Sequence, residues 1–264
     1  MIYCNLKGGL GNMFFQIAAA KSIAIDAGTD CSFPNLESQL HLINSDSVHN
    51  PKIKHGLEYK TILKNLKSDR PDNRIPVHSF PFHYTQPQLL TDLVIDGFFQ
   101  SEKYFAHNRE EILNYLNFDD VAKIVDEKYG DLLNVKTTAV HVRRGDYVRH
   151  PNHHPTQSIE YYSEAMDLLQ AITDTFVVFS DDIDWCKENL NYSDSIYIDN
   201  EKDYIELYLM SLCDNNIIAN SSFSWWGAWL NQNNNKIVVG PKQWFGSAIT
   251  HDTSDILPES WIKI

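Results

Sequence analysis

Short apolar stretches alternate with helix-like stretches through the second half of the chain, and this alternation limits the folds that the chain can adopt. The runs Thr137–Val142 and Phe176–Phe179 are rich in apolar residues and are typical of buried strands. The stretches that follow them, Ile159–Ile172 and Asp182–Leu190, have helical spacing. Strands that alternate with helices of this length predict an α/β fold with parallel sheets and helices on both faces.

The same pattern extends towards both ends of the chain. We expect further strands at Ile2–Leu6, Leu93–Phe99, Ser195–Ile198, Ile217–Ala219 and Ile237–Val239, and further helices at Met13–Ala27, Tyr104–Leu116, Val121–Leu133 and Tyr204–Cys213. The stretch from Pro34 to Pro87 has scattered prolines, histidines and asparagines and predicts loops and short elements. We place a domain boundary near Val135, which gives an N-terminal lobe of residues 1–135 and a second lobe of residues 136–264.

Charge and cysteine content exclude several classes of partner. The 264 residues include 22 Lys and Arg and 35 Asp and Glu, a formal net charge of −13. A uniformly acidic protein repels nucleic acid and anionic lipid, so a phosphorylated ligand would need a local cluster of basic residues. The four cysteines are scattered without a Cys-x-x-Cys pair, which argues against a zinc site and a disulfide framework. No signal-peptide pattern and no run of the ~20 apolar residues of a membrane helix is present, so we expect a cytoplasmic protein.

The strongest candidate site is the run His141-Val142-Arg143-Arg144-Gly145-Asp146-Tyr147, directly at the end of a buried strand. Ligands of open α/β sheets bind beyond the carboxyl ends of the strands. A guanidinium presents two donors to phosphate oxygens, and Gly145 permits a tight turn close to a ligand. The alternative is an ion pair between an arginine and Asp146 that only holds the loop.

A glycine-rich loop, Gly8-Gly9-Leu10-Gly11-Asn12, separates the first strand from the first helix. Such a loop can direct backbone N–H groups at a phosphate, although a plain strand-to-helix turn is the alternative. It departs from the dinucleotide-binding fingerprint, because Phe14 stands where a third Gly or Ala is required. Asp30 would also begin its strand rather than end it.

Two further polar runs follow predicted strands. The run Ser180-Asp181-Asp182-Ile183-Asp184 has carboxylates that can bind a metal or accept hydrogen bonds from a base or ribose, or can cap the next helix. The run Asn220–Trp229 offers hydroxyl and N–H groups at a helix start, which suit a phosphate. Its tryptophans can stack on a base or a sugar, or pack in the core. His150, His153 and His154 lack zinc-site spacing and predict a mobile loop over a cleft.

These motifs together resemble the bacterial-type α-1,2-fucosyltransferases of glycosyltransferase family 11. The resemblance rests on Gly8–Gln16, Gly97–Phe105, His141–Tyr147, Ser180–Asp182 and Asn220–Leu230, in that order. One departure is Met13, where the family usually has Gln. The resemblance implies a two-lobed fold of the glycosyltransferase B type with Rossmann-like parallel sheets. It also implies an inverting, metal-independent transfer of L-fucose from GDP-fucose to a galactose hydroxyl of a glycan acceptor.

The resemblance also implies roles for individual residues. The donor would contact Gly9, Gly11, Asn12, His141, Arg143, Arg144, Asp181, Asp182, Ser222, Phe223 and Ser224, and the second lobe would bind it. Arg143 and Arg144 would stabilise the leaving diphosphate, and Asn12 would face the diphosphate or the fucose across a cleft. Gln100 and Trp225 are assigned to the acceptor.

A base for the acceptor proton is left open between Asp146 and Glu102. Asp146 can instead orient an arginine, and Glu102 can instead cap a helix, in which case the departing phosphate or water takes the proton. No cofactor is implied. We expect Arg143→Ala to abolish transfer while the protein stays folded.

Three other functions are consistent with parts of the sequence. They are a fucosyltransferase of another linkage, a non-catalytic sugar-nucleotide-binding module, and an NAD(P) oxidoreductase, which the missing third glycine disfavours. The family implies galactose-terminated acceptors of a surface polysaccharide or glycolipid precursor. Peripheral contact with membrane-borne acceptors therefore stays open.

Overall fold

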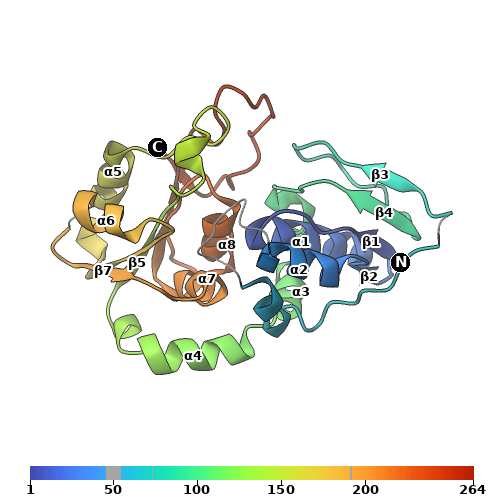
Figure 1. The fold of residues 1–264 in the computed structure, drawn as a ribbon, viewed down its shortest axis with the longest axis horizontal. Coiled ribbons are helices and arrows are strands. Elements are labelled where there is room, and N and C mark those ends of the chain that lie inside the picture. The colour runs from blue at the N-terminus through green and yellow to red at the C-terminus, as the bar shows by residue number, and fades with distance from the viewer. Residues whose placement is uncertain (46–54, 73, 191) are drawn as a thin grey trace. The chain divides into compact units, whose positions relative to one another are not determined.

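The computed structural model describes residues 1–45, 55–72, 74–190 and 192–264, which form two compact units (Figure 1). Of these residues, unit 1 contains those up to Phe118 together with His251–Pro258. Unit 2 contains Asp119–Thr250 and Glu259–Ile264. Each unit is built on its own parallel sheet.

The sheet of unit 1 has the strand order β2–β1–β4–β3, with parallel neighbours. Its strands are β1 (Ile2–Cys4), β2 (Cys31–Ser32), β3 (Val77–Ser79) and β4 (Leu93–Asp96). The alanine-rich helix α1 (Leu10–Asp26) packs against β1 and β2 and ends before Gly28, whose φ of +62° suits glycine. Asp30 directly precedes β2, whereas the acid of the dinucleotide fingerprint follows that strand.

The remaining elements of unit 1 differ most from the sequence-based expectation. They are α2 (Leu36–Ser45), η1 (Gly56–Thr61), η2 (Glu102–Tyr104), η3 (Ala106–Asn108) and α3 (Arg109–Tyr115). The continuous helix expected at Tyr104–Leu116 is broken, because Phe105 adopts a φ of −147° outside the helical region. The stretch Pro34–Pro87, expected to hold loops and short elements, contains α2, η1 and β3, and its residues 46–54 and 73 lie outside the described residues.

The sheet of unit 2 has the strand order β10–β9–β8–β5–β6–β7, with parallel neighbours. Its strands are β5 (Thr137–Val142), β6 (Thr175–Ser180), β7 (Ser195–Ile198), β8 (Asn215–Ile217), β9 (Val238–Gly240) and β10 (Ile262–Lys263). The chain runs outwards from β5 to β7 and then returns to β8 on the other side of β5. This is the order of doubly wound nucleotide-binding sheets, in which ligands bind where the direction reverses, beyond the carboxyl ends of β5 and β8.

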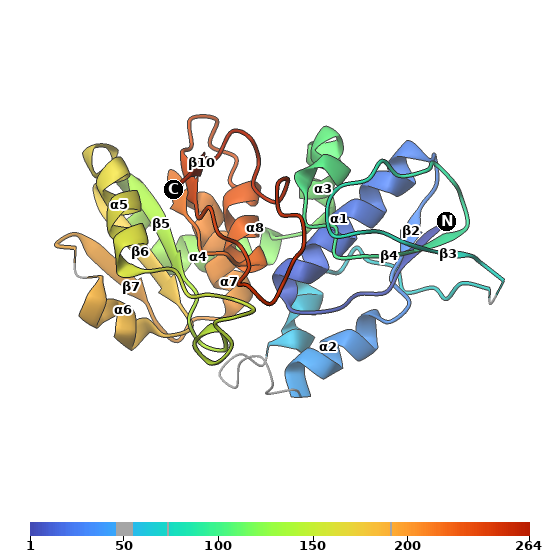
Figure 2. The ribbon, with the colours of Figure 1, turned by 90° about the horizontal axis from the view of Figure 1, so that it is seen from above.

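Helices cover both faces of this sheet, as the alternating sequence pattern predicts. Figure 2 shows α5 (Ile159–Leu169) and α6 (Ile183–Asn189) on one face, and α7 (Asp203–Leu212) and α8 (Ser222–Leu230) on the other. Within the described residues, no helix combines the length and apolarity needed to cross a bilayer.

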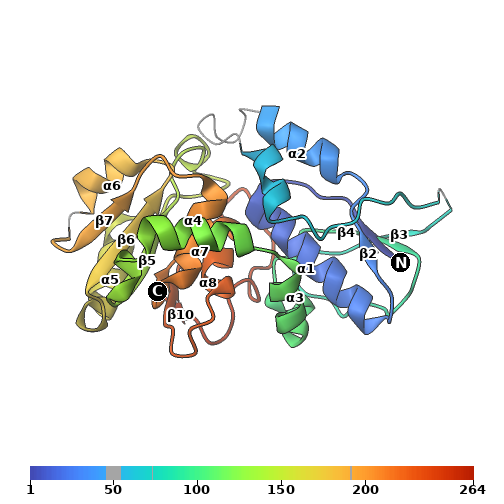
Figure 3. The same cartoon turned by 90° about the horizontal axis from the view of Figure 1, so that it is seen from below.

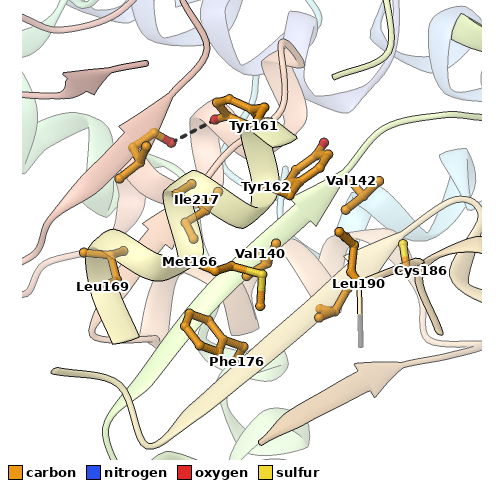
Figure 4. Packing of buried hydrophobic residues seen from close by; sticks show 13 residues of the cluster. Val140, Val142, Tyr161, Tyr162, Met166, Leu169, Phe176, Cys186, Leu190 and Ile217 are labelled. Carbon is orange, nitrogen blue, oxygen red and sulfur yellow. Dashed lines mark hydrogen bonds between the residues drawn. The ribbon is translucent and has the colours of Figure 1, made fainter. Parts of the chain in front are cut away.

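The packing of α5 on the sheet shows why this part of the chain folds as the sequence predicts. Tyr162 and Met166 lie one helical turn apart on α5 and are completely buried in the cluster that also contains Val140 and Val178 (Figure 4). The Tyr161 hydroxyl donates to the backbone oxygen of Ile218, 2.6 Å away. The hydroxyl is thereby satisfied inside the core.

The boundary between the units lies at Phe118 and Asp119, earlier than the expected division near Val135. The reason is α4 (Asp119–Tyr129), which packs along α7 and therefore belongs to unit 2 (Figure 3). Lys128 Nζ and the Tyr129 hydroxyl reinforce this packing with hydrogen bonds of 2.8 and 3.0 Å to Glu201.

Strand β8 begins two residues before the expected strand at Ile217–Ala219, because two buried asparagines take part in it. The side-chain oxygen of Asn215 accepts from the Ile237 amide at 2.9 Å. Asn216 donates to the Met210 carbonyl at 2.8 Å. Polar side chains that are satisfied in this way are tolerated inside a sheet, which local hydrophobicity does not reveal.

Candidate active site

Arg143 lies directly beyond β5, at the point where the sheet of unit 2 reverses direction. Its Nη2 donates to Asp146 Oδ1 at 2.7 Å, and its Nη1 lies 3.1 Å from Asp181 Oδ2. Burial lowers the pKa of the guanidinium, but Asp181 and Asp146 outweigh burial and hold this pKa above its usual value. The ion pair with Asp146 that the sequence offered as an alternative is therefore present, and Asp181 joins it.

Arg144 is held by the run that follows β6. Its backbone amide donates to Asp181 Oδ1 at 2.9 Å, and its Nε donates to Asp182 Oδ2 at 3.0 Å. Its guanidinium lies 3.9 Å from the ring centre of Trp185. Among the described contacts of Arg144, none engages the two terminal Nη groups, so these keep donors for a ligand.

Asp182 stands at the N-cap position of α6, where the sequence allowed a capping role. Within the described residues its side chain makes no capping hydrogen bond, because the carboxylate faces Arg144 instead. The helix-capping interpretation is therefore wrong for Asp182. Among all the residues that the structure describes, no group of three or more His, Cys, Asp or Glu side chains is arranged to hold a metal ion.

His141, near the end of β5, is 5% exposed, and its ring centre lies 5.4 Å from that of Phe223 at the start of α8. Burial and the charge of Arg143 lower the pKa of His141 to about 3. The imidazole is therefore neutral near pH 7. Its Nδ1 finds no hydrogen-bond partner among the described residues. This neutral group can bind a polar ligand atom without adding charge.

The first turn of α8 separates exposed from buried candidates. Ser222 and Phe223 are partly exposed, and the amide of Phe223 donates to the Ser221 side chain at 3.3 Å. The Ser224 hydroxyl is buried and donates to the backbone oxygens of Ala219 and Ser221, which precede α8. Trp225 is completely buried against other tryptophans, so it packs in the core, as one of the two sequence-based interpretations predicted. It therefore has no exposed surface that could contact an acceptor.

Asn220 joins three segments beside the arginines. It follows β8, and its carbonyl accepts from the Tyr147 hydroxyl at 3.1 Å. Its side-chain amide donates to the backbone oxygens of Pro155 and Trp244 at 3.0 and 2.9 Å. Sequence reasoning missed this role, because the partners lie 24 or more residues from Asn220 and carry no local signal.

The histidine-rich segment predicted to be a mobile loop is attached to a second segment of unit 2. The His154 ring stacks on Tyr147 with centres 4.9 Å apart. The backbone of His153 accepts from the Gly246 amide at 2.9 Å, and that of Asn152 accepts from Ala248 at 2.8 Å. The segment therefore packs against the end of the arginine motif.

The other candidate residues lie in unit 1. Gly9 is the N-cap of α1, and Gly11 is buried in its first turn. Asn12 Oδ1 accepts from Gln100 Nε2 at 2.6 Å, so the first turn of α1 meets the segment that follows β4. Glu102 begins η2, but Ser101 is the residue that caps this turn. The structure thus brings the candidates together as two groups, one in each unit.

Comparison with known proteins agrees with this arrangement. Residues 34–264 match the model of glycosyl transferase family 11. An α-1,2-colitosyltransferase of Escherichia coli is 36% identical over 100% of this chain and 99% of its own length. The O-antigen biosynthesis glycosyltransferase WbnK of the same species is 29% identical over 100% of both chains.

A similar solved structure is that of the fucosyltransferase NodZ from Bradyrhizobium. It covers 86% of this chain and 92% of its own, with a TM-score of 0.53 and 13% identity. This likeness confirms the expected fold class, the glycosyltransferase B type with Rossmann-like parallel sheets. The family model spans well over half of the sequence, and the chain belongs to glycosyltransferase family 11.

Proposed function

We propose that this glycosyltransferase moves L-fucose from GDP-fucose to a galactose hydroxyl of a glycan, with inversion and in α-1,2 linkage. The observation that carries the proposal is the position of Arg143 and Arg144, which lie at the reversal point of a nucleotide-binding strand order. The α-1,2 linkage in the name of the colitosyltransferase relative supports the proposed linkage.

Arg143 and Arg144 have the chemistry that the leaving group requires. Breaking the bond between fucose and phosphate develops negative charge on the departing GDP and positive charge on the sugar ring. Fixed cations near the β-phosphate stabilise that negative charge, and they can do so without a metal ion. Asp181 and Asp146 keep the Arg143 guanidinium charged and oriented before the donor arrives.

The groups around the arginines suit the rest of the nucleotide. Neutral His141 and the partly exposed Phe223 offer a polar atom and an aromatic face to the guanosine. The Asp182 side chain is 39% exposed and can accept hydrogen bonds from the ribose or base. The hydroxyl of Ser222 and the first amides of α8 can bind a phosphate oxygen.

We assign different roles to Asp146 and Glu102. The Asp146 carboxylate is committed to Arg143 at 2.7 Å, so we assign it to positioning that arginine. Glu102, at the start of η2, stays the candidate base for the acceptor proton.

GDP-colitose is a second candidate donor to compare with GDP-fucose, because the 36% identical relative is named for colitose transfer. Colitose is the 3-deoxy counterpart of L-fucose. An enzyme that binds the fucose 3-hydroxyl by hydrogen bonds would reject the deoxy sugar, because its polar groups would be left without a partner.

The test is mass spectrometry of lactose incubated with the purified protein and GDP-fucose, with and without EDTA. We expect a product heavier by one fucosyl unit in both reactions. Loss of product with EDTA would contradict the metal-free mechanism. A higher kcat/KM for GDP-colitose than for GDP-fucose would change the donor assignment. Failure to bind GDP in calorimetry would overturn the proposal.

A further inference from the structure

Unit 1 has polar side chains at the carboxyl ends of two neighbouring strands that no role yet assigned requires. Asp96 is the last residue of β4, and Lys7 follows the adjacent strand β1. Lys7 Nζ donates to Asp96 Oδ1 at 2.7 Å, and both side chains keep substantial exposure, 39% and 48%. Carboxyl ends of parallel strands are where α/β sheets bind ligands.

An aromatic ring lies beside this ion pair. Lys7 Nζ is 4.9 Å from the centre of the Phe98 ring, and Phe98 is 37% exposed. The neighbouring Phe99 is completely buried, with its ring centre 5.1 Å from that of Phe80 and 5.2 Å from that of Tyr104. The chain therefore places two consecutive phenylalanines in opposite environments.

The backbone of Phe99, between Gln100 and the exposed Phe98, is strained. Phe99 has a φ of +52°, a conformation that is uncommon and strained for a bulky residue. The turn is tightly packed at Gly97, because a Cβ there would lie 3.1 Å from Phe80 Cβ and from the Phe99 ring. Close packing thus maintains a strained turn whose consequence is the exposed Phe98 ring. Such strain persists most often at functional sites.

The next residue adds a buried acceptor. Gln100 is 7% exposed, and its Nε2 donates to Asn12 Oδ1 at 2.6 Å. Its Oε1 finds no hydrogen-bond partner among the described residues. A buried acceptor without a partner is unfavourable, and a hydrogen bond from a ligand hydroxyl would satisfy it.

We propose that Lys7, Asp96 and Phe98 form the subsite that binds the terminal pyranose of the acceptor, with Gln100 beside them. A pyranose has an apolar C–H face and a rim of hydroxyl groups. The Phe98 ring packs on the apolar face, Asp96 accepts from a hydroxyl, and Lys7 donates to another. This inference rests on the proposed function, because it supplies the acceptor site of the same transfer.

A purely structural ion pair is the competing explanation for Lys7 and Asp96. An exposed pair of this kind contributes little to stability. It also gives no reason for the strained Phe99 or for the exposed ring that the ammonium group covers on one side. A sugar subsite accounts for the ion pair, the ring and the strain together.

The chain offers a matched control for the charge. Asp92 pairs with the N-terminal amine at 2.9 Å, at the opposite end of the same two strands. Asp92→Asn and Asp96→Asn therefore remove similar ion pairs from the two ends of one sheet. Asp92 has a φ of +56°, which asparagine tolerates.

The experiment measures KM for lactose and for GDP-fucose separately. We expect Asp96→Asn and Phe98→Ala to raise KM for lactose by about tenfold or more, the size of one lost hydrogen bond to a charged group. KM for GDP-fucose should change far less. Phe98→Tyr should keep KM for lactose close to the wild-type value, because it keeps the aromatic ring. Phe98→Leu should raise KM as Phe98→Ala does. Asp92→Asn should behave as the wild-type protein.

Binding of lactose without donor, read by saturation-transfer difference NMR, tests the subsite separately from the transfer reaction. Signal from the wild-type protein that is lost in Phe98→Ala supports the subsite even if GDP-fucose is not the donor. An unchanged KM for lactose in both variants overturns it, as does an absent lactose signal from the wild-type protein. An equal loss in Asp92→Asn also overturns it, since the effect would then be structural.

Discussion

The charged side chains of the proposed donor site form ion pairs with one another. Arg143 pairs with Asp146 and with Asp181, whose side chain is only 2% exposed. A buried carboxylate that loses its partner destabilises a protein by roughly 3–5 kcal/mol. We therefore expect Arg143→Ala to weaken the fold as well as to abolish transfer. The sequence alone led us to expect an intact fold, and the burial of Asp181 is the reason for the different prediction.

Arg143→Lys separates the two effects. The lysine keeps a positive charge beside Asp181 and Asp146 but loses the two-pronged donor geometry. We expect the melting temperature to change little, while kcat falls by roughly 100-fold, as for loss of one donor to a developing anion. Arg149→Lys, on an exposed arginine of the same loop, is the control. A kcat close to that of the wild-type protein would refute the assigned role.

His141 makes stability depend on pH. Its pKa is lowered from 6.5 to about 3 in the folded protein, chiefly by burial and further by Arg143. Between these values the unfolded chain binds a proton that the folded protein does not. Its contribution to stability is therefore complete above pH 6.5, and falls by about 1.4 kcal/mol for each pH unit below that value.

Urea unfolding at pH 7 and pH 5 measures this contribution. We expect the wild-type protein to lose about 2 kcal/mol more than His141→Asn over this interval. The exposed His150→Asn should lose as much as the wild-type protein. Equal losses in all three proteins would show that His141 is not the group responsible.

At the scale of elements, close backbone contact joins the two segments beside the arginine motif. Gly246 lies so near Asn152 that a Cβ would meet its carbonyl oxygen at 2.4 Å. The Gly246 amide also donates to His153 O at 2.9 Å. These are backbone atoms, so rotation of a side chain cannot relieve the clash. The segments must separate if Gly246 gains a side chain.

We accordingly expect Gly246→Ala to lower stability by about 1–3 kcal/mol, the range for overpacked sites. It should also remove hydrogen-exchange protection from the amides of Gly246 and Ala248. Gly9→Ala is the matched control, because a Cβ at Gly9 meets nothing within 4 Å. Retained protection in Gly246→Ala would contradict this account of the contact.

At the scale of the whole molecule, the chain builds two units around two sheets, and the division does not follow the order of the chain. Unit 2 gains α4 from before its first strand, while His251–Pro258 returns to unit 1. The protein has a net charge of −13, and its Arg143 and Arg144 are paired with carboxylates. Binding of the proposed phosphorylated donor would therefore depend on local hydrogen-bond donors rather than on a basic surface.

The position of α4 predicts that unit 2 depends on it. Val121 and Val125 are completely buried on this helix. Changing both to alanine should destabilise the protein by roughly 2–4 kcal/mol, from lost apolar burial and the cavities left behind. Chemical denaturation with tryptophan fluorescence measures this. Ala122→Gly, on a partly buried site of the same helix, should cost only the ~1 kcal/mol of helix propensity. Equal losses would show that α4 packs only loosely.

Local patterns in the sequence determined much of unit 2. Strands Thr137–Val142 and Ser195–Ile198 have the expected bounds, because an apolar or β-branched run between turn residues is a local signal. The position of Arg143 and Arg144 beyond a buried strand follows from the same signal. In unit 1 the short strands β2 and β3 were missed, since two or three residues carry too little periodicity to be recognised.

Tertiary structure alone decided which of these pieces meet. Strand β8 pairs with β5, and this pairing brings Phe223 to His141 and Asn220 to Tyr147. The sequence left open whether Asp182 caps a helix or contacts a ligand, and did not reveal its ion pair with Arg144. Strand order and ion pairing depend on contacts between residues far apart in the chain. The favoured arrangement is the one that buries apolar surface and pairs every buried charge. A short window of neighbouring residues does not contain that information.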